Sequence, residues 1–239
     1  MASRRTFIEA ALVAGAISAL ASVSMNAQVR QNQTRRRVLV FDVNETMLDV
    51  GALAPHFARA FGRAEVLQEW FSNVLLYSNV VTVAGPYADF AAVGGAALDM
   101  VATAHGVMLS AGDRQQILGG VRTLPAHADV RPALERLRGA GFRLVTLTNS
   151  APAAVEAQLK NAGLSTLFER SLSVDTVKRF KPAPEPYHHV ARELGVATTL
   201  LRMIAAHPWD VLGALRAGCA AAFVARPGKA MFPLVHNLT

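Results

Sequence analysis

Short apolar runs alternate with longer amphipathic stretches along most of this 239-residue chain. The first clear run, Val38–Phe41, is wholly apolar with β-branched residues, a pattern typical of a buried parallel strand. Similar runs predict further strands at 142–147, 172–174, 201–205 and 220–224. Helical patterns fill the intervals at 130–138, 150–161, 186–194 and 211–217, with Ser150 as the N-cap of the second of these helices. Alternating strands and helices predict an α/β fold built on a doubly wound parallel sheet.

The interval 51–123 has a different pattern. It contains no strong strand signal, and its apolar residues recur at helical spacing, as in the face formed by Val66, Leu67, Trp70, Phe71, Val74 and Leu75. Two more helical stretches follow at 87–105 and 110–121. We therefore expect a helical subdomain over 51–123, inserted into a core domain that comprises 28–50 and 124–239.

The first 27 residues read as a leader. An Arg4–Arg5 pair precedes an apolar run from Ala10 to about Val23, and small residues follow. This order is typical of a secretory signal, and the arginine pair indicates the twin-arginine type. We expect cleavage after Ala21 or Ala27 and a periplasmic protein. The alternatives are an uncleaved amphipathic anchor and, if the leader is not functional, a cytoplasmic protein.

Composition excludes several classes of function. The net charge is +7, but no basic face is interleaved with aromatic residues, so we expect no nucleic-acid partner. No uninterrupted apolar stretch has the length of a membrane span, so we expect no stable membrane insertion once the leader is removed. A single cysteine, Cys219, rules out an internal disulfide.

Polar residues gather where the predicted strands end. Asp42 directly follows the first strand, and Thr148 with Asn149 follows the second. Alone, Asp42 would be read as a turn residue. Open α/β sheets, however, bind ligands at the carboxyl ends of their strands, so these side chains are candidates for a common site.

The order and spacing of these residues resemble the four motifs of the haloacid dehalogenase superfamily, and most closely its type II (S)-2-haloacid dehalogenases, over about residues 36–228. The matching positions are Asp42 with Thr46, Thr148 with Asn149, Lys181–Pro182 with Tyr187, and Trp209–Asp210. The resemblance implies that the helical insertion is a cap that closes over the active site. It also implies that no cofactor is needed and that a homodimer can form through the cap.

The resemblance also implies roles for these residues. Asp42 would be the nucleophile, and Lys181 would keep it ionised, although a lysine before proline can equally be a solvent-exposed turn residue. Thr46 would hydrogen-bond to Asp42, and Asp210 would complete the catalytic group. Substrate contacts would come from Thr148, Asn149, Tyr187, Trp209, Phe71 and Asn44.

Departures from the family pattern sharpen the prediction. Superfamily phosphatases have a second aspartate where this chain has Asn44, and a further metal-binding carboxylate where it has Ala206. Because magnesium needs several oxygen ligands, we expect no metal. Phe71 occupies the place of the arginine that type II dehalogenases commonly use to hold the departing halide and the substrate, and it can equally be an ordinary packing residue of the apolar face on its helix.

Two further departures form a pair. His207 replaces the usual asparagine of the fourth motif, and Glu45 replaces a glycine of the first. We expect these two side chains to meet and to activate the hydrolytic water, because histidine is a natural base near neutral pH. The simpler alternative is a structural histidine.

The predicted reaction is hydrolysis of small (S)-2-haloacids to (R)-2-hydroxy acids through a metal-independent ester on Asp42. One alternative is a magnesium-dependent phosphatase acting on small phosphate esters. Another is an exported, non-catalytic binding protein. Serine hydrolases and dinucleotide-binding proteins are excluded because neither Gly-x-Ser-x-Gly nor Gly-x-Gly-x-x-Gly occurs.

Overall fold

Five parallel strands form the sheet at the centre of this protein, whose computed structural model describes residues 37–234. The strand order is β3-β2-β1-β4-β5, and the predicted doubly wound α/β fold is confirmed. The strands are β1 (Val38–Phe41), β2 (Arg143–Thr148), β3 (Arg170–Ser173), β4 (Leu201–Ala205) and β5 (Ala220–Phe223). In the central position, β1 pairs with both β2 and β4, which explains why all four of its residues are apolar and buried.

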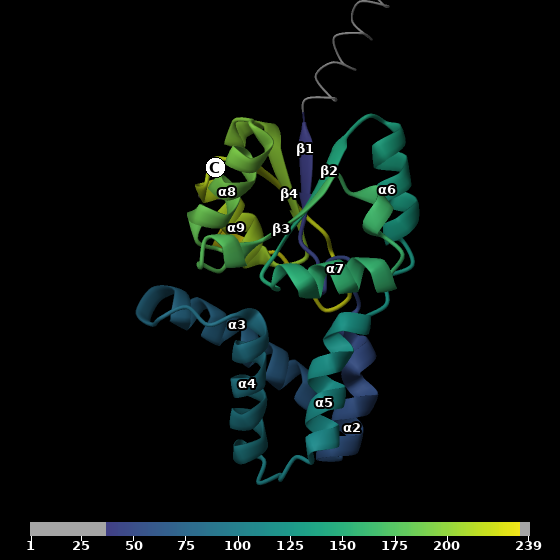
Figure 1. Cartoon of the computed structure of the whole chain (residues 1–239), viewed down its shortest axis with the longest axis vertical. Coiled ribbons are helices and arrows are strands. Elements are labelled where there is room, and N and C mark those ends of the chain that lie inside the picture. The colour runs from purple at the N-terminus through teal and green to yellow at the C-terminus, as the bar shows by residue number, and fades with distance from the viewer. Residues whose placement is uncertain (1–36, 235–239) are drawn as a thin grey trace, which may run out of the picture.

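Four helices cover the two faces of the sheet. They are α6 (Val130–Gly139), α7 (Pro152–Asn161), α8 (Pro184–Leu194) and α9 (Pro208–Arg216). Right-handed crossovers place α6 and α7 on one face and α8 and α9 on the other, and Figure 1 shows α6 opposite α8 and α9. The last three of these helices begin with proline, which lacks the N–H that a first helical turn would leave unpaired.

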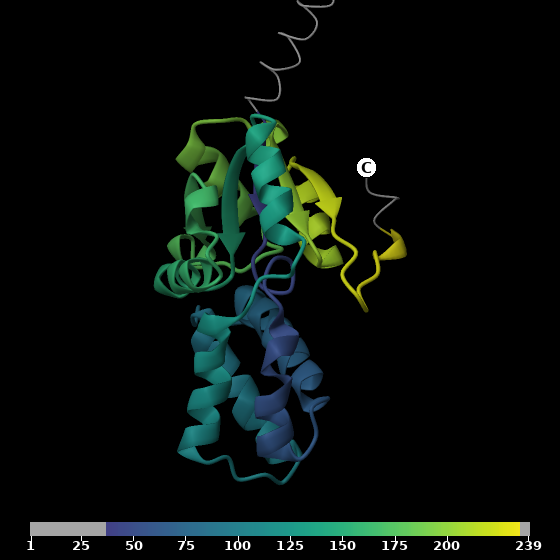
Figure 2. The ribbon, with the colours of Figure 1, turned by 90° about the vertical axis from the view of Figure 1, so that its right-hand side faces the viewer.

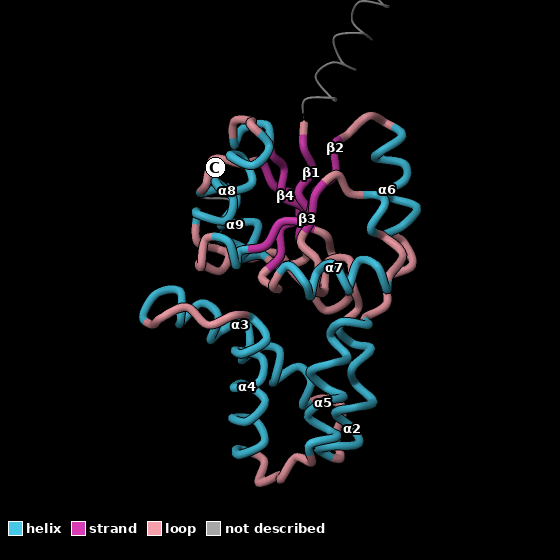
Figure 3. Tube along the Cα trace, viewed as in Figure 1, coloured by secondary structure: helices cyan, strands magenta, loops and turns pink. Residues whose placement is uncertain are grey.

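The cap is a separate lobe of helices, next to the carboxyl ends of the strands (Figures 1 and 2). It consists of α2 (Ala54–Phe61), α3 (Val66–Ala84), α4 (Phe90–Ala104) and α5 (Ala111–Gly120). Short 3-10 turns lie at Val50–Leu53, Val121–Thr123, Ser165–Leu167, Val174–Thr176 and Thr198–Leu200. The first two of these turns connect the cap to the core, and Figure 3 shows that the strands belong to the core lobe alone.

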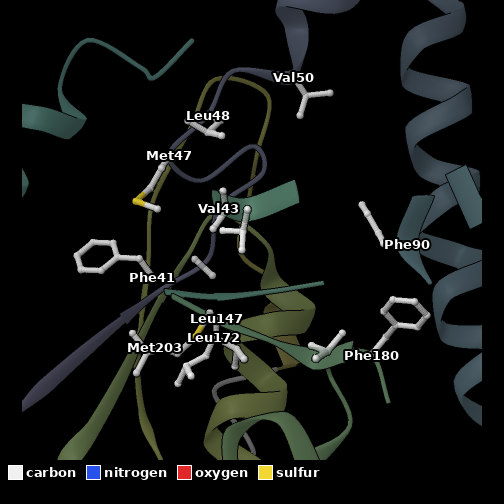
Figure 4. Close-up of a cluster of buried hydrophobic side chains, with 14 of the residues drawn as sticks. Phe41, Val43, Met47, Leu48, Val50, Phe90, Leu147, Leu172, Phe180 and Met203 are labelled. Atoms are coloured by element: carbon white, nitrogen blue, oxygen red, sulfur yellow. The ribbon is translucent and has the colours of Figure 1, made fainter. Parts of the chain in front are cut away.

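Apolar packing continues from the sheet to the cap. Figure 4 shows Phe41, Leu147, Leu172 and Met203 of the sheet together with the turn residues Val43, Met47 and Leu48. Phe180 of the core lies with its ring centre 6.0 Å from that of Phe90 in the cap. Three hydrogen bonds join the same parts of the lobes: the Phe180 N–H donates to Thr82 Oγ1 at 3.1 Å, the Arg179 guanidinium donates to the Thr82 carbonyl, and the Tyr87 hydroxyl donates to Asp175 at 3.0 Å.

The predicted N-cap of α7 is wrong by one residue. The N-cap is Ala151, which has no capping side chain. Ser150 is unavailable because its N–H donates to Thr148 Oγ1 at 3.1 Å and its hydroxyl oxygen accepts from Asn44 at 3.2 Å. Smaller differences in bounds occur at β3, which begins at Arg170, and at α8, which begins at Pro184.

The predicted leader, 1–27, lies outside the described residues. Within 37–234, no helix combines the length and the apolar character that a membrane crossing requires.

Candidate active site

Asp42 lies at the end of the central strand, and both of its carboxylate oxygens are hydrogen-bonded. Its backbone N–H continues the sheet by donating to Ile204 O of β4 at 3.0 Å. Lys181 Nζ is 2.9 Å from Oδ1, while Thr46 Oγ1 is 2.6 Å and His207 Nδ1 3.2 Å from Oδ2. Burial alone would raise the pKa of Asp42, but Lys181, His207 and Thr46 outweigh it and hold the pKa well below its usual range. Asp42 is therefore an ionised carboxylate with fixed orientation.

Lys181 lies between two carboxylates behind Asp42. Its side chain is fully buried, and its three ammonium protons match three acceptors: Asp42, Asp210 Oδ2 at 2.6 Å, and Leu147 O at 3.0 Å. Burial would lower the pKa of Lys181, but Asp210 and Asp42 raise it above its usual value. A charged lysine with every donor used is a rigid electrostatic support for the carboxylate of Asp42.

The turn after β1 places Glu45 opposite His207. Glu45 adopts φ of 60°, in the left-handed region that favours glycine, and the resemblance places a glycine here in relatives. Such a conformation costs a non-glycine residue about 1–3 kcal/mol. Two contacts of Glu45 Oε2 offset this cost: His207 Nε2 at 2.7 Å and Lys229 Nζ at 2.8 Å. The strained turn is thus tied to the histidine.

His207 links Glu45 to the nucleophile. Its ring contacts Glu45 through Nε2 and Asp42 through Nδ1, and it stacks on Trp209 with ring centres 4.8 Å apart. Burial would lower the pKa of His207, but the hydrogen bonds and charges of the two carboxylates raise it to about 9. The imidazole is therefore protonated near neutral pH and donates from both nitrogens. The predicted pair does meet. While Asp42 is ionised, His207 is a proton donor, and its role as a base in the hydrolytic step stays a prediction.

Three predicted substrate contacts are engaged inside the protein. Tyr187 is 1% exposed and its hydroxyl donates to Asp210 Oδ1 at 2.6 Å. Thr148 is equally buried and accepts a hydrogen bond from the Ser150 backbone. Asn44 donates to Ser150 and accepts from Gln158. Because these side chains are buried and bonded to protein groups, we revise their predicted role from contacting substrate to positioning other residues.

The other three predicted substrate residues are arranged differently. Asn149 uses its Oδ1 to accept from the Lys181 backbone at 3.2 Å, which leaves its amide protons to a ligand. Trp209 is half-buried, with Lys181 Nζ 6.0 Å from its ring centre. Phe71 belongs to the cap rather than the core. It lies on α3 and lines a cavity between the lobes.

Several residues of the site were missed in the sequence. Gln158, fully buried on α7, donates both to Asn44 Oδ1 at 2.8 Å and to Val121 O at 2.9 Å. Arg226 follows the last strand and donates twice to the Thr46 carbonyl, at 3.0 and 2.9 Å. A buried glutamine between Val155 and Leu159 was a signal in the sequence, whereas Arg226 and Lys229 lie in a loop with no pattern.

A cavity of about 530 Å³ lies between part of the cap and the start of α7 in the core. Its cap wall includes Trp70, Phe71 and Phe90, and its core wall includes Ser150 and Ala151 at the start of α7. Among residues 37–234, no three histidine, cysteine, aspartate or glutamate side chains are arranged to share a metal ion.

The site is centred on a buried, ionised aspartate that a lysine holds at the carboxyl edge of a parallel sheet, next to a helical cap. The family model that describes haloacid dehalogenase-like hydrolases matches residues 36–218. This chain therefore belongs to the haloacid dehalogenase-like hydrolase family.

Individual relatives agree with this assignment. The (S)-2-haloacid dehalogenase of Xanthobacter autotrophicus is 32% identical over 192 residues, which cover 80% of this chain and 75% of that protein. The (S)-2-haloacid dehalogenase 1 of Pseudomonas sp. strain CBS-3 is 31% identical over 180 residues, covering 74% of this chain and 79% of the relative. The solved structure of L-2-haloacid dehalogenase from Xanthobacter autotrophicus has a TM-score of 0.75 at 30% identity and covers 84% and 86% of the two chains. A second structure of that enzyme, with chloropropionic acid covalently bound, matches equally well.

Proposed function

We propose that this protein is a hydrolase of carbon–halogen bonds that converts (S)-2-haloacids into (R)-2-hydroxy acids, through an ester on Asp42 and without a metal. The observation that carries the proposal is the carboxylate of Asp42, kept ionised by Lys181, Thr46 and His207. The relatives named as (S)-2-haloacid dehalogenases support the substrate class. The Xanthobacter structure with covalently bound chloropropionic acid supports a covalent route.

In the first step, one oxygen of Asp42 attacks C2 of the haloacid from the side opposite the halogen. The new C–O bond forms as the C–halogen bond breaks, the halide leaves with the bonding electron pair, and C2 is inverted. Burial at the cap–core junction aids this attack, because a poorly hydrated, oriented carboxylate is a better nucleophile towards carbon. Lys181 remains charged throughout and keeps the carboxylate aimed.

In the second step, water attacks the carboxyl carbon of Asp42, and the bond from this carbon to the ester oxygen breaks. The hydroxy acid leaves with that oxygen, so the configuration set at C2 is retained and the carboxylate of Asp42 is restored. Ester formation removes the negative charge of Asp42, which is one of the two carboxylates that raise the pKa of His207. The pKa of His207 then falls, its proton passes to solvent, and the neutral ring accepts one proton of the attacking water while the other passes to the departing oxygen of the hydroxy acid. Glu45 keeps the ring in place through Nε2.

The test is halide release from (S)-2-chloropropionate in EDTA, with Asp42→Asn as the control. Release that persists in EDTA and disappears in the control supports the proposal. Absence of release, combined with hydrolysis of phosphate esters in magnesium, would replace it with the phosphatase alternative. The His207→Ala variant should accumulate the Asp42 ester, visible as a mass increase of the intact protein. Normal turnover of this variant with no adduct would remove His207 from the mechanism.

Export to the periplasm through the twin-arginine route and dimerisation through the cap stay predictions. Fractionation of cells that produce the full chain tests the first, and light scattering of the purified protein tests the second.

A further inference from the structure

The cavity between cap and core is far larger than a three-carbon haloacid needs. Its volume of about 530 Å³ falls in the range of pockets that hold drug-sized ligands. Small residues on both sides provide this space: Gly94 and Gly119 on the cap helices, and Ala151 and Ala154 at the start of α7. A ligand that fills this space has a substantial carbon skeleton.

Most of the large side chains around the cavity are apolar, and Gln115 and Arg122 are the large polar ones. Trp70, Phe71 and Val74 approach it from α3, and Phe90 approaches it from the first turn of α4. The Trp70 ring is held in position because its Nε1 donates to Gly94 O at 2.9 Å. Phe71 makes the wall apolar at the position where the resemblance predicts an arginine. Aromatic and aliphatic walls of this kind bind hydrocarbon.

Arg122 contributes a positive charge to the same cavity. It lies in the turn Val121–Thr123, where the chain returns from the cap to the core. The other charged residue on the wall is Asp89, whose carboxylate caps α4 by accepting from the Ala92 N–H at 2.8 Å. Within 37–234, Arg122 forms no ion pair or side-chain hydrogen bond. Its guanidinium is therefore available to a ligand, and its shape suits a carboxylate.

The cavity also lies next to the nucleophile turn. Ser150 lines the cavity, and its Oγ accepts a hydrogen bond from Asn44 Nδ2 at 3.2 Å. Asn44 is two residues after Asp42, in the turn that carries the nucleophile. Asp42 itself does not line the cavity, and the hydrogen bond from Asn44 to Ser150 connects its turn to the cavity wall.

We propose that the cavity selects 2-haloacids with a long or aromatic side chain, and that Arg122 holds their carboxylate in place of the missing cap arginine. This inference rests on the proposed function, because it names the substrate class of that reaction. The carbon chain occupies the apolar wall around Trp70 and Phe90. The carboxylate faces Arg122, and C2 lies towards Ser150 on the core wall, the residue that a hydrogen bond joins to the turn of Asp42.

Binding of unreactive acids tests the inference without requiring turnover. Tryptophan fluorescence, to which Trp70 in the cavity wall contributes, gives the Kd of propionate, hexanoate and 3-phenylpropanoate. Each buried methylene should tighten binding about fourfold, so hexanoate should bind about 60-fold more tightly than propionate. Equal Kd values for propionate and hexanoate would overturn the apolar part of the inference.

Arg122→Gln tests the charge. It should weaken hexanoate binding about tenfold or more and leave hexanamide within twofold, because only the acid needs the guanidinium. Arg122→Lys should recover part of the lost affinity. A loss of similar size for hexanamide would mean that Arg122 acts only on the structure, and no loss for hexanoate would remove it from binding.

A pair of variants on α7 tests the location. Ala154→Leu reduces the cavity and should abolish the preference for hexanoate over propionate, whereas Ala157→Leu, on the same helix but outside the cavity wall, should keep it. Loss of the preference in both variants, or in neither, would contradict the assignment to this cavity.

Halide release from 2-chloropropionate and 2-chlorohexanoate separates this inference from the proposed function. Release from both acids with no gain in kcat/KM for the longer one overturns the inference and leaves the dehalogenase. Length-dependent, Arg122-dependent binding with no release from either acid supports the cavity assignment and overturns the dehalogenase.

Discussion

His207→Asn should remove a pH dependence of stability that arises from one buried proton. In the unfolded chain, a histidine loses its proton near its ordinary pKa of 6.5, whereas in the folded protein the pKa of His207 is raised to about 9. The contribution of protonated His207 to the free energy of unfolding is therefore fully present below pH 6.5, and it is lost as the pH rises from 6.5 to 9. At about 1.4 kcal/mol for each tenfold change in proton affinity, this interval is worth about 3 kcal/mol.

Urea unfolding followed by circular dichroism, from pH 6 to pH 9.5, measures the effect. The free energy of unfolding of the wild type should fall by about 3 kcal/mol relative to His207→Asn between pH 6.5 and 9. His189→Asn is the matched control, because burial lowers the pKa of His189 and its contribution changes only as the pH falls below 6.5.

Glu45→Gln gives an independent check, since it removes one of the two carboxylates that raise the pKa of His207. The fall in stability should then end at a lower pH than in the wild type. A constant difference between wild type and His207→Asn across pH 6.5–9 would show that the ring is neutral in the folded protein, and the reasoning would be refuted.

Two further substitutions probe the support behind the nucleophile. Tyr187→Phe removes the hydroxyl that donates to the buried Asp210 Oδ1 and should lower the free energy of unfolding by about 1–3 kcal/mol. Tyr77→Phe removes no hydrogen bond within 37–234 and should change it little. Equal effects of the two substitutions in urea unfolding would contradict the supporting role of Tyr187. Gly213→Ala would place a methyl carbon 2.6 Å from the Tyr187 hydroxyl and should destabilise by about 1–3 kcal/mol. Gly139→Ala, with no heavy atom within 4 Å of the new carbon, should be neutral or stabilising, and a similar melting temperature for both alanine variants would refute the predicted clash.

Much of the fold could be predicted because it depends on local patterns. The central strand is recognisable from Val38–Phe41, since a strand buried on both faces has to be apolar throughout. The position of Asp42 follows from the end of that strand. The start of α7 was predicted one residue early because Ser150, a good N-cap residue by type, is committed to contacts with Thr148 and Asn44.

A contact in the site could be predicted where the positions of two residues along the chain bring them together. It could not be predicted where one side chain has several possible partners in space. The meeting of Glu45 and His207 could be expected from two coupled departures at strand ends. The protonation of His207 could not, because it depends on a second carboxylate, Asp42, within hydrogen-bond distance. Tyr187 was predicted to contact the substrate because its spacing from Lys181 matches the family motif. Spacing along the chain does not tell whether its hydroxyl donates to a substrate or to Asp210. Arg122 went unnoticed because its turn has no pattern.

The attachments of the cap are unevenly distributed, and this bears on how a substrate enters. On one side, two linkers of the chain connect the lobes, next to Leu53 and next to Val121. The Gln158 amide of the core also donates a hydrogen bond to the Val121 carbonyl. On the other side, the lobes are joined by hydrogen bonds at Thr82 and Tyr87 and by ring packing of Phe90. The covalent linkers keep the lobes together on the first side, whereas the hydrogen bonds and ring packing on the other side can break. We therefore expect the cap to rotate about the two linkers and to break the contacts of Thr82, Tyr87 and Phe90. Substrate would then enter, and product leave, on the side of these contacts.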